Sequence, residues 1–183
     1  MIVVQFSRCG RKLIYFYTYN NFYYMKDIII LRATPKYAKN LYELDKFAEK
    51  EIKWWVAPSL DYQKSLIKNK KNLILLAKNE EEFVGFLYAK LKNYGNYINP
   101  NLKEKYGKKY RISLESIYVK KEYRNKGISN KLVSKLREYR KNNYWKEKIQ
   151  GIELLTEDKN IKIFEKLGFK KVMNYMNSNE DRK

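Results

Sequence analysis

The stretch "IYVKKEYRNKGISNKLVSKL", Ile117–Leu136, decides the fold, because a glycine in it joins a strand pattern to a helix pattern. The chain has seven glycines in 183 residues, and Gly127 stands where the apolar run ends and helical spacing begins. A glycine there adopts backbone angles that a side chain would block. The helix after it begins with unpaired N–H groups and the positive end of its dipole. This arrangement favours a bound phosphate.

The neighbouring side chains support a phosphate site. Arg124 and Lys126 add positive charge, and Ser129 adds a hydroxyl donor. Taken alone, an R-x-x-G pattern is weak evidence, because many strand-to-helix turns contain a glycine only to turn the backbone.

The rest of the chain alternates between strand and helix patterns from Met25 onward. Apolar periodicity predicts strands at residues 28–33, 73–78, 83–91, 113–119, 152–156 and 169–176. It predicts helices from residue 35 to about 50 and at 59–69, 128–142 and 160–167. The sum is an α+β (α/β layered) fold, with a mixed, mostly antiparallel sheet flanked by helices.

The ends of the chain differ from this pattern. Residues 1–24 combine short apolar pieces, a basic cluster and many tyrosines, and we expect them to lie outside the domain, as an extension or an over-extended start. The competing interpretation is an edge strand at Leu13–Tyr17. We therefore expect a domain at residues 25–176 and a polar tail at 177–183.

Composition excludes several kinds of chemistry. The chain has no histidine, which excludes a histidine base, a Ser-His triad and an ordinary zinc site. Its one cysteine, Cys9, allows no intrachain disulfide and no cysteine-based metal site, so we expect no metal and a reducing cytoplasm. No apolar run reaches about 18 residues, so no transmembrane helix is expected.

The formal net charge of +20 indicates an anionic partner, such as a phosphate, nucleic acid, an acidic protein or a lipid surface. The alternative is that the many lysines reflect genome composition and lie on solvated faces. The chain contains no block of five consecutive basic residues, which would indicate a dedicated nucleic-acid surface.

The segment "LESIYVKKEYRNKGISNKLVSKL" resembles the acetyl-coenzyme A signature of the GNAT superfamily of N-acetyltransferases, a strand followed by R/Q-x-x-G-x-G/A and a long helix. Further segments agree in order and spacing: "ILRATPKYAKNLYEL", "FVGFLYAKL" and "IKIFEKLGFKKV". The resemblance spans about Ile28 to Met176.

The resemblance implies which residues bind acetyl-coenzyme A. It assigns the pyrophosphate to a loop that comprises Arg124, Asn125, Lys126, Gly127, Ile128 and Ser129. Ser129 departs from the usual Gly or Ala but is small. In the family the strand before this loop is bulged and splayed from its neighbour, so N–H groups of Ile117, Tyr118 and Val119 would meet the pantetheine and the thioester carbonyl.

Glu115 is the predicted catalytic base. With regular strand pairing it shares a face with Ile117 and Val119. "SLESIYV" also resembles the "LED" strand of diamine and polyamine acetyltransferases, whose Glu accepts the amine proton. A lysine-like ammonium has a pKa near ~10.4, so an attacking amine needs a proton acceptor. The alternatives are that Glu115 only pairs with a Lys or Arg, and that Glu49, Glu51, Glu104 or solvent is the base.

Two positions depart from the family pattern. Phe164 stands where many members have a tyrosine that protonates the leaving thiolate, so water, Tyr118 or Tyr175 would have to serve. Asn160 is the candidate for an asparagine that contacts the pantetheine. Fourteen residues follow Phe169, too few for the usual final pair of strands, so the last strand is either missing or supplied by another chain of a homodimer.

The resemblance therefore implies an N-acetyltransferase that moves acetyl from acetyl-coenzyme A directly to a primary amine in a ternary complex. The acceptor stays open between a protein N-terminus, a lysine, a polyamine and another small amine. In the family it lies near residues 49–58, with Trp54 and Trp55, and near 93–110. The alternative from another class is a catalytically weakened GNAT-fold module that binds nucleic acid or ribosomes.

Overall fold

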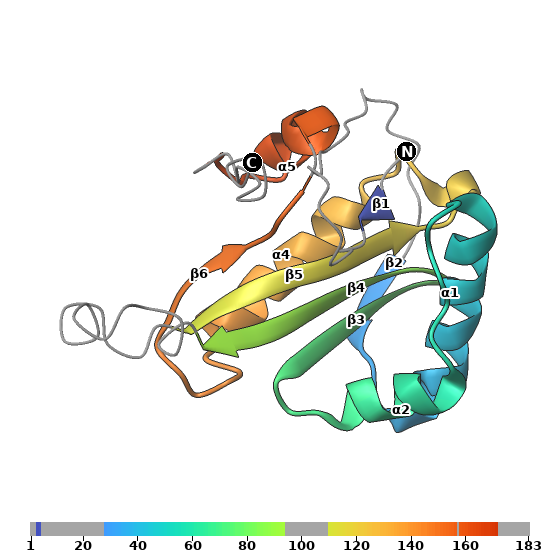
Figure 1. Cartoon of the computed structure of the whole chain (residues 1–183), viewed down its shortest axis with the longest axis horizontal. Coiled ribbons are helices and arrows are strands. Elements are labelled where there is room, and N and C mark those ends of the chain that lie inside the picture. The colour runs from blue at the N-terminus through green and yellow to red at the C-terminus, as the bar shows by residue number, and fades with distance from the viewer. Residues whose placement is uncertain (1–2, 5–27, 94–109, 157, 172–183) are drawn as a thin grey trace, which may run out of the picture.

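One sheet with helices on both of its faces organises the computed structural model, which describes residues 3–4, 28–93, 110–156 and 158–171 (Figure 1). Its strands are β1 (Val3–Val4), β2 (Ile28–Arg32), β3 (Asn72–Asn79), β4 (Glu82–Asn93), β5 (Tyr110–Val119) and β6 (Ile149–Glu153). Its helices are α1 (Ala38–Glu51), α2 (Leu60–Lys68), α4 (Ile128–Lys141) and α5 (Ile161–Lys166), with single 3-10 turns at Pro35–Tyr37, Lys121–Tyr123 and Asp158–Asn160. The predicted α+β layered fold is confirmed.

The two edges of strand β5 are paired differently. Strands β2, β3, β4 and β5 pair antiparallel in sequence order, and β4 covers one whole edge of β5. On the other edge, β6 runs parallel to β5 and pairs only with Tyr110, Ile112 and Ser113. Further along the same edge, β1 pairs with Ile117 and Tyr118. Figure 1 shows β6 and β1 beside opposite ends of β5.

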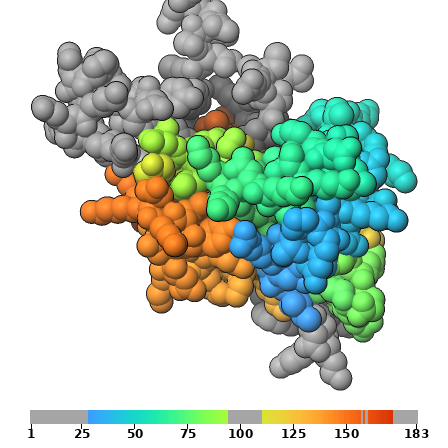
Figure 2. Space-filling view, turned by 90° about the horizontal axis from the view of Figure 1, so that it is seen from below, coloured from blue at the N-terminus to red at the C-terminus, as the bar shows by residue number. Residues whose placement is uncertain are grey.

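Two apolar cores lie on the two faces of the sheet. Helix α4 packs one face with residues at helical spacing, among them Ile128, Leu132 and Leu136, as predicted. Helix α5 joins the same core. Helix α1 packs the other face through its stripe of Leu41, Leu44 and Ala48, together with α2. Seen from below, the edge strand β2 lies between the α1–α2 side and the α4 side (Figure 2).

Three predicted strands end differently or lie outside the described residues. Strand β6 begins three residues earlier than predicted, because Ile149 and Ile152 pair with β5, whereas Leu155 is exposed. Residues 169–171 form no strand, and the rest of the predicted strand 169–176 lies outside the described residues. The alternative edge strand Leu13–Tyr17 and most of the loop at 93–110 lie outside them as well. Within the described residues, no helix is long and apolar enough to cross a membrane.

Gly85 allows the backbones of β4 and β5 to approach closely beside the end of β5. A Cβ atom at this position would lie 2.6 Å from the carbonyl oxygen of Tyr118 and 3.2 Å from Cα of Val119. Both atoms belong to the backbone, so neither moves without shifting β5. A side chain at residue 85 would therefore displace the segment that leads into the Gly127 loop.

Replacing Gly85 with alanine should lower the free energy of unfolding by about 1–3 kcal/mol, because a methyl group there forces two paired backbones apart. Urea denaturation of the full chain measures this change. Gly151→Ala in β6 is the matched control, since nothing lies within 4 Å of a Cβ there, and it should be close to neutral. Equal stability of the two variants would contradict the close approach.

Candidate active site

The loop before α4 has the geometry of an anion site. Asn125 and Gly127 both lie in the left-handed region, with φ of 66° and 73°. Gly127 is the N-cap of α4, and no side chain caps the helix at this end. Nothing lies within 4 Å of a Cβ at Gly127, so the space in front of it is open. The first turn of α4 also carries no acidic residue. Its N–H groups and dipole are therefore available to a phosphate.

The loop side chains divide into outward and inward groups. Asn125 and Lys126 are exposed, and the Lys126 ammonium lies 5.0 Å from the centre of the Tyr123 ring. Ile128 and Ser129, the first two residues of α4, are buried. Arg124, which the sequence suggested as a positive charge for phosphate, turns back into the protein. Its Nε donates to the carbonyl of Val119 at 2.8 Å, and its Nη2 binds Glu51.

The edge of β5 beside this loop is the second part of the site. Strand β6 pairs with β5 no further than Ser113, so Ile117, Tyr118 and Val119 have no partner on β6. On that edge the structure places Val4 opposite Ile117 and Val3 opposite Tyr118. The backbone groups that the sequence assigns to pantetheine are thus next to β1.

A β-bulge corrects the predicted orientation of Glu115. Tyr88 pairs with Ser116 and Ala89 pairs with Leu114, so Glu115 is an extra residue on β5. The strand alternation therefore breaks at this point. Ile117 and Val119 face the α4 core, as Leu114 does. The prediction that Glu115 shares their face is wrong, because it assumed regular pairing. The Glu115 side chain lies on the α1–α2 face instead, beside Lys92 and Tyr88.

The Glu115 carboxylate lies in a small polar group. The Lys92 ammonium is 2.7 Å from Oε1 of Glu115 and donates to the Ser113 hydroxyl at 3.0 Å. Oε1 is buried and accepts no hydrogen bond of good geometry. Burial raises the pKa of Tyr88, and the Glu115 carboxylate adds to the rise. The Tyr88 phenol therefore stays protonated at neutral pH and donates to Asn72 at 3.2 Å.

The residues at the second family motif lie inside the α4 core. Phe164 on α5 is 1% exposed, and its ring meets Phe169 edge to face at a centroid distance of 5.5 Å. Asn160 precedes α5 and is also buried. The structure therefore places Phe164 in the core on the α4 side of the sheet, away from the face of Glu115.

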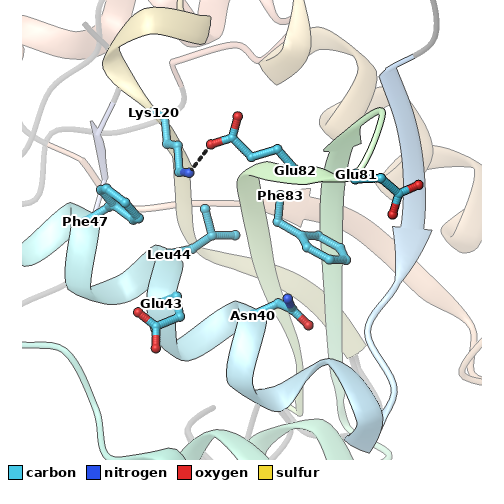
Figure 3. A pocket seen from close by; sticks show the side chains of 8 residues that line it. All are labelled: Asn40, Glu43, Leu44, Phe47, Glu81, Glu82, Phe83 and Lys120. Atoms are coloured by element: carbon cyan, nitrogen blue, oxygen red, sulfur yellow. Dashed lines mark hydrogen bonds and ion pairs between the residues drawn. The ribbon is translucent and has the colours of Figure 1, made fainter.

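A cavity of about 240 Å³ lies between α1 and the turn from β3 to β4 (Figure 3). Its lining includes Lys120, the residue directly after Val119. The Lys120 ammonium binds Glu82 and lies 4.2 Å from the centre of the Phe47 ring. None of the predicted site residues lines this cavity. The contacts of Lys120 with Glu82 and Phe47 instead hold the chain in place directly after β5.

Comparison with known proteins identifies the family. Residues 70–171, more than half of the chain, match the Acetyltransferase (GNAT) domain. The chain belongs to the GNAT acetyltransferases. It is therefore an acetyl-coenzyme A-dependent acyltransferase. A comparison with curated proteins finds no match for the sequence.

Solved structures share the GNAT fold at low sequence identity. A possible acetyltransferase from Clostridium difficile 630 is 20% identical, with a TM-score of 0.60, over 84% of this chain and 97% of the other. AAC(6')-Iy in complex with the bisubstrate analog CoA-S-monomethyl-acetylneamine is 17% identical, with a TM-score of 0.60, over 83% and 99%. An aminoglycoside acetyltransferase from an uncultured soil metagenomic sample, in complex with sisomicin, is 14% identical, with a TM-score of 0.59, over 82% and 95%. At these identities the likeness shows the fold.

No group of three or more His, Cys, Asp or Glu side chains in residues 3–4, 28–93, 110–156 and 158–171 lies close enough to hold a metal ion.

The segment between α1 and α2 is held by a buried acid that the sequence did not single out. Asp45 on α1 accepts hydrogen bonds from the Trp55 indole at 3.0 Å and from the Gln63 amide. Trp55 is a core residue, whereas the Trp54 ring is 48% exposed. Only Trp54 of the two can therefore present its ring to a ligand. The sequence does carry a signal for Asp45, which is a charged residue on the apolar stripe of α1, four residues after Leu41 and three before Ala48.

The burial of Asp45 predicts a pH-dependent stability. Burial raises the pKa of Asp45 to about 7, and the hydrogen bonds from Trp55 and Gln63 only partly oppose it. The folded state thus retains a proton that the unfolded state has lost above about pH 4. The stability that this proton contributes is fully present below about pH 4 and is lost as the pH rises to about 7.

Asp45→Asn should remove this dependence of stability on pH, because asparagine stays neutral. Its Oδ1 can accept from Trp55, and its Nδ2 can donate to Oε1 of Gln63 once the Gln63 amide turns over, since this oxygen is buried without a hydrogen-bond partner. Urea unfolding at pH 4.5, 6 and 8 measures this effect. The free energy of unfolding of the variant should rise relative to that of the natural chain as the pH rises, by up to about 4 kcal/mol at pH 8. Asp61→Asn, an exposed acid on α2 whose pKa is lowered by Lys64, is the control. Parallel pH profiles of Asp45→Asn and the natural chain would contradict a neutral Asp45.

Proposed function

We propose that this protein is an N-acetyltransferase that transfers the acetyl group of acetyl-coenzyme A directly to a primary amine. One observation carries the proposal: the edge of β5 that β6 leaves uncovered runs into an uncapped helix N-terminus at Gly127. Such an edge offers backbone donors to an extended thioester, and the helix offers N–H groups to its pyrophosphate.

The proposed site for acetyl-coenzyme A, the acetyl donor, uses backbone groups more than side chains. N–H groups of Ile117, Tyr118 and Val119 would meet the pantetheine and the thioester carbonyl. The loop 124–129 would hold the pyrophosphate, with Lys126 as its exposed cation. Phe164 on α5 and Asn160 just before it, both buried in this structure, would border the site. This placement requires Val3–Val4 to leave the edge of β5, in keeping with a domain that begins at Met25.

Glu115 is the proposed proton acceptor for the attacking amine. The bulge turns its carboxylate to the α1–α2 face, and Lys92 demonstrates that a primary ammonium fits against this carboxylate at 2.7 Å. An acceptor amine would take a similar position, lose its proton to Glu115 and attack the thioester carbonyl. The second proton of the attacking nitrogen would pass through water to the leaving thiolate, because Phe164 has no proton to give and the Tyr118 hydroxyl donates to Glu51.

The acceptor class is proposed from charge and from the amine chemistry. A small polyamine or an aminoglycoside suits the Glu115 carboxylate but approaches a chain of net charge +20. A protein N-terminus or lysine in an anionic setting, such as the ribosome surface, suits that charge better. Trp54 on the segment between α1 and α2 is the proposed contact for the acceptor. We also propose a cytoplasmic location, since the single cysteine and the cosubstrate fit a reducing compartment.

Coenzyme A should raise the melting temperature of the full chain, because it binds only the folded state. Gly127→Glu should abolish the shift, since its side chain would fill the open space before α4 and repel the pyrophosphate. The control is Gly151→Ala, which should keep the shift. A chain that starts at Met25 should bind coenzyme A at least as tightly as the full chain. An undiminished shift in Gly127→Glu would place the cosubstrate elsewhere.

Glu115→Gln should lower turnover by about 10²- to 10⁴-fold, because the amide cannot accept the amine proton. Its affinity for coenzyme A should stay nearly unchanged, as the side chain lies on the opposite face from the α4 core. Release of the free thiol with a panel of amines and peptides measures turnover. Glu138→Gln, which alters an exposed ion pair with Lys135 on α4, is the control. Natural turnover in Glu115→Gln, with chemistry rate-limiting, would leave Glu115 as an ion-pair partner of Lys92.

A further inference from the structure

One carboxylate joins three parts of the proposed cosubstrate site. Glu51 is the last residue of α1. Its Oε1 accepts the hydroxyl of Tyr118 at 3.0 Å, and its Oε2 binds the guanidinium of Arg124. Arg124 in turn donates from Nε to the carbonyl oxygen of Val119 at 2.8 Å. Helix α1, the end of β5 and the start of the loop are thus connected through side chains.

This connection fixes the peptide group between Val119 and Lys120. Its carbonyl accepts from Arg124, and its N–H donates to the carbonyl of Val84 at 2.9 Å. The Lys120 side chain is held as well, by Glu82 and the Phe47 ring (Figure 3). Both hydrogen-bonding groups of this peptide are therefore occupied by the protein, which sets its orientation.

The Arg124 end of this connection lies largely out of water. The Arg124 side chain is 8% exposed, and its guanidinium lies 5.9 Å from the centre of the Tyr118 ring. Burial raises the pKa of Tyr118, and the Glu51 carboxylate raises it further, so the phenol remains a donor. Removing Glu51, whose side chain is 25% exposed, leaves the buried Arg124 guanidinium without its partner.

We propose that Glu51 and Arg124 are positioning residues that hold the end of β5 in register with the loop 124–129. Arg124 acts through the carbonyl of Val119, and its side chain is not a ligand of the pyrophosphate. The inference rests on the proposed function, since it concerns the two halves of the same cosubstrate site. Correct spacing of those halves lets the pantetheine and the pyrophosphate bind together.

The opposite role for Arg124 makes opposite predictions. If Arg124 were a phosphate ligand restrained by Glu51, Glu51→Gln would release the Arg124 side chain and increase the affinity for coenzyme A. If Arg124 holds Val119, the same change loosens the end of β5 and decreases the affinity for coenzyme A. Arg124→Lys separates the two roles again, because lysine keeps the charge but cannot reach both Val119 and Glu51 with a planar group.

Isothermal titration calorimetry of the full chain with coenzyme A tests the proposal. Glu51→Gln, Arg124→Lys and Arg124→Gln should each weaken binding by about tenfold, and the double variant Glu51→Gln/Arg124→Gln should be little weaker than either single change. Glu49→Gln is the matched control on the same helix, since Glu49 binds Lys46 and the N–H of Ala57 but nothing on β5. It should leave the affinity unchanged.

Three outcomes would overturn the proposal. These are tighter or unchanged binding in Glu51→Gln, full affinity in Arg124→Lys, and additive losses in the double variant. Melting temperatures without ligand identify a variant that fails to fold, in which case Arg124→Lys alone decides. A natural chain that binds no coenzyme A would overturn the proposed function itself, and the inference with it. Binding by the natural chain that Glu51→Gln does not weaken would overturn the inference alone.

Discussion

The uneven pairing of β5 is the constraint on which the site depends. Strand β4 occupies one edge of β5 from end to end, but β6 leaves the other edge after Ser113. Buried backbone N–H and carbonyl groups need partners, so the rest of that edge must be satisfied by something other than β6. In this structure Val3–Val4 pairs with Ile117 and Tyr118 there. An extended thioester needs the same kind of partner, and the two occupants cannot share the edge.

Local patterns made most of the architecture predictable. The hairpin of β3 and β4 and the apolar stripe of α4 follow from period-2 and helical spacing within single segments. The family resemblance implied a bulge in this strand but did not place it at Glu115, although the sequence carries a signal for that position. Ile112 and Leu114 are two residues apart, as are Ile117 and Val119, but Leu114 and Ile117 are three apart. That extra residue reverses the face of Glu115.

Contacts between distant segments were not predictable in this way. Glu51 and Arg124 are separated by 73 positions, and no local pattern selects one of the chain's acidic residues as the partner of Arg124. The same holds for Asp45, whose partners Trp55 and Gln63 come from the linker and α2. Such pairs depend on how α1 packs over the sheet. The sequence therefore identified the loop at Gly127 but interpreted Arg124 as a free cation.

The bulge links the two sides of the proposed reaction. Bulges bend a strand and raise its local twist, and the last β6 partner on β5, Ser113, lies just before Glu115. The same extra residue turns the Glu115 carboxylate away from the α4 core, toward Lys92 and the α1–α2 face. One inserted residue thus accompanies both an edge that β6 leaves free for the acetyl donor and a carboxylate on the face proposed for the acceptor. The amine and the thioester would then reach β5 from different sides, which is the geometry that direct attack in a ternary complex requires.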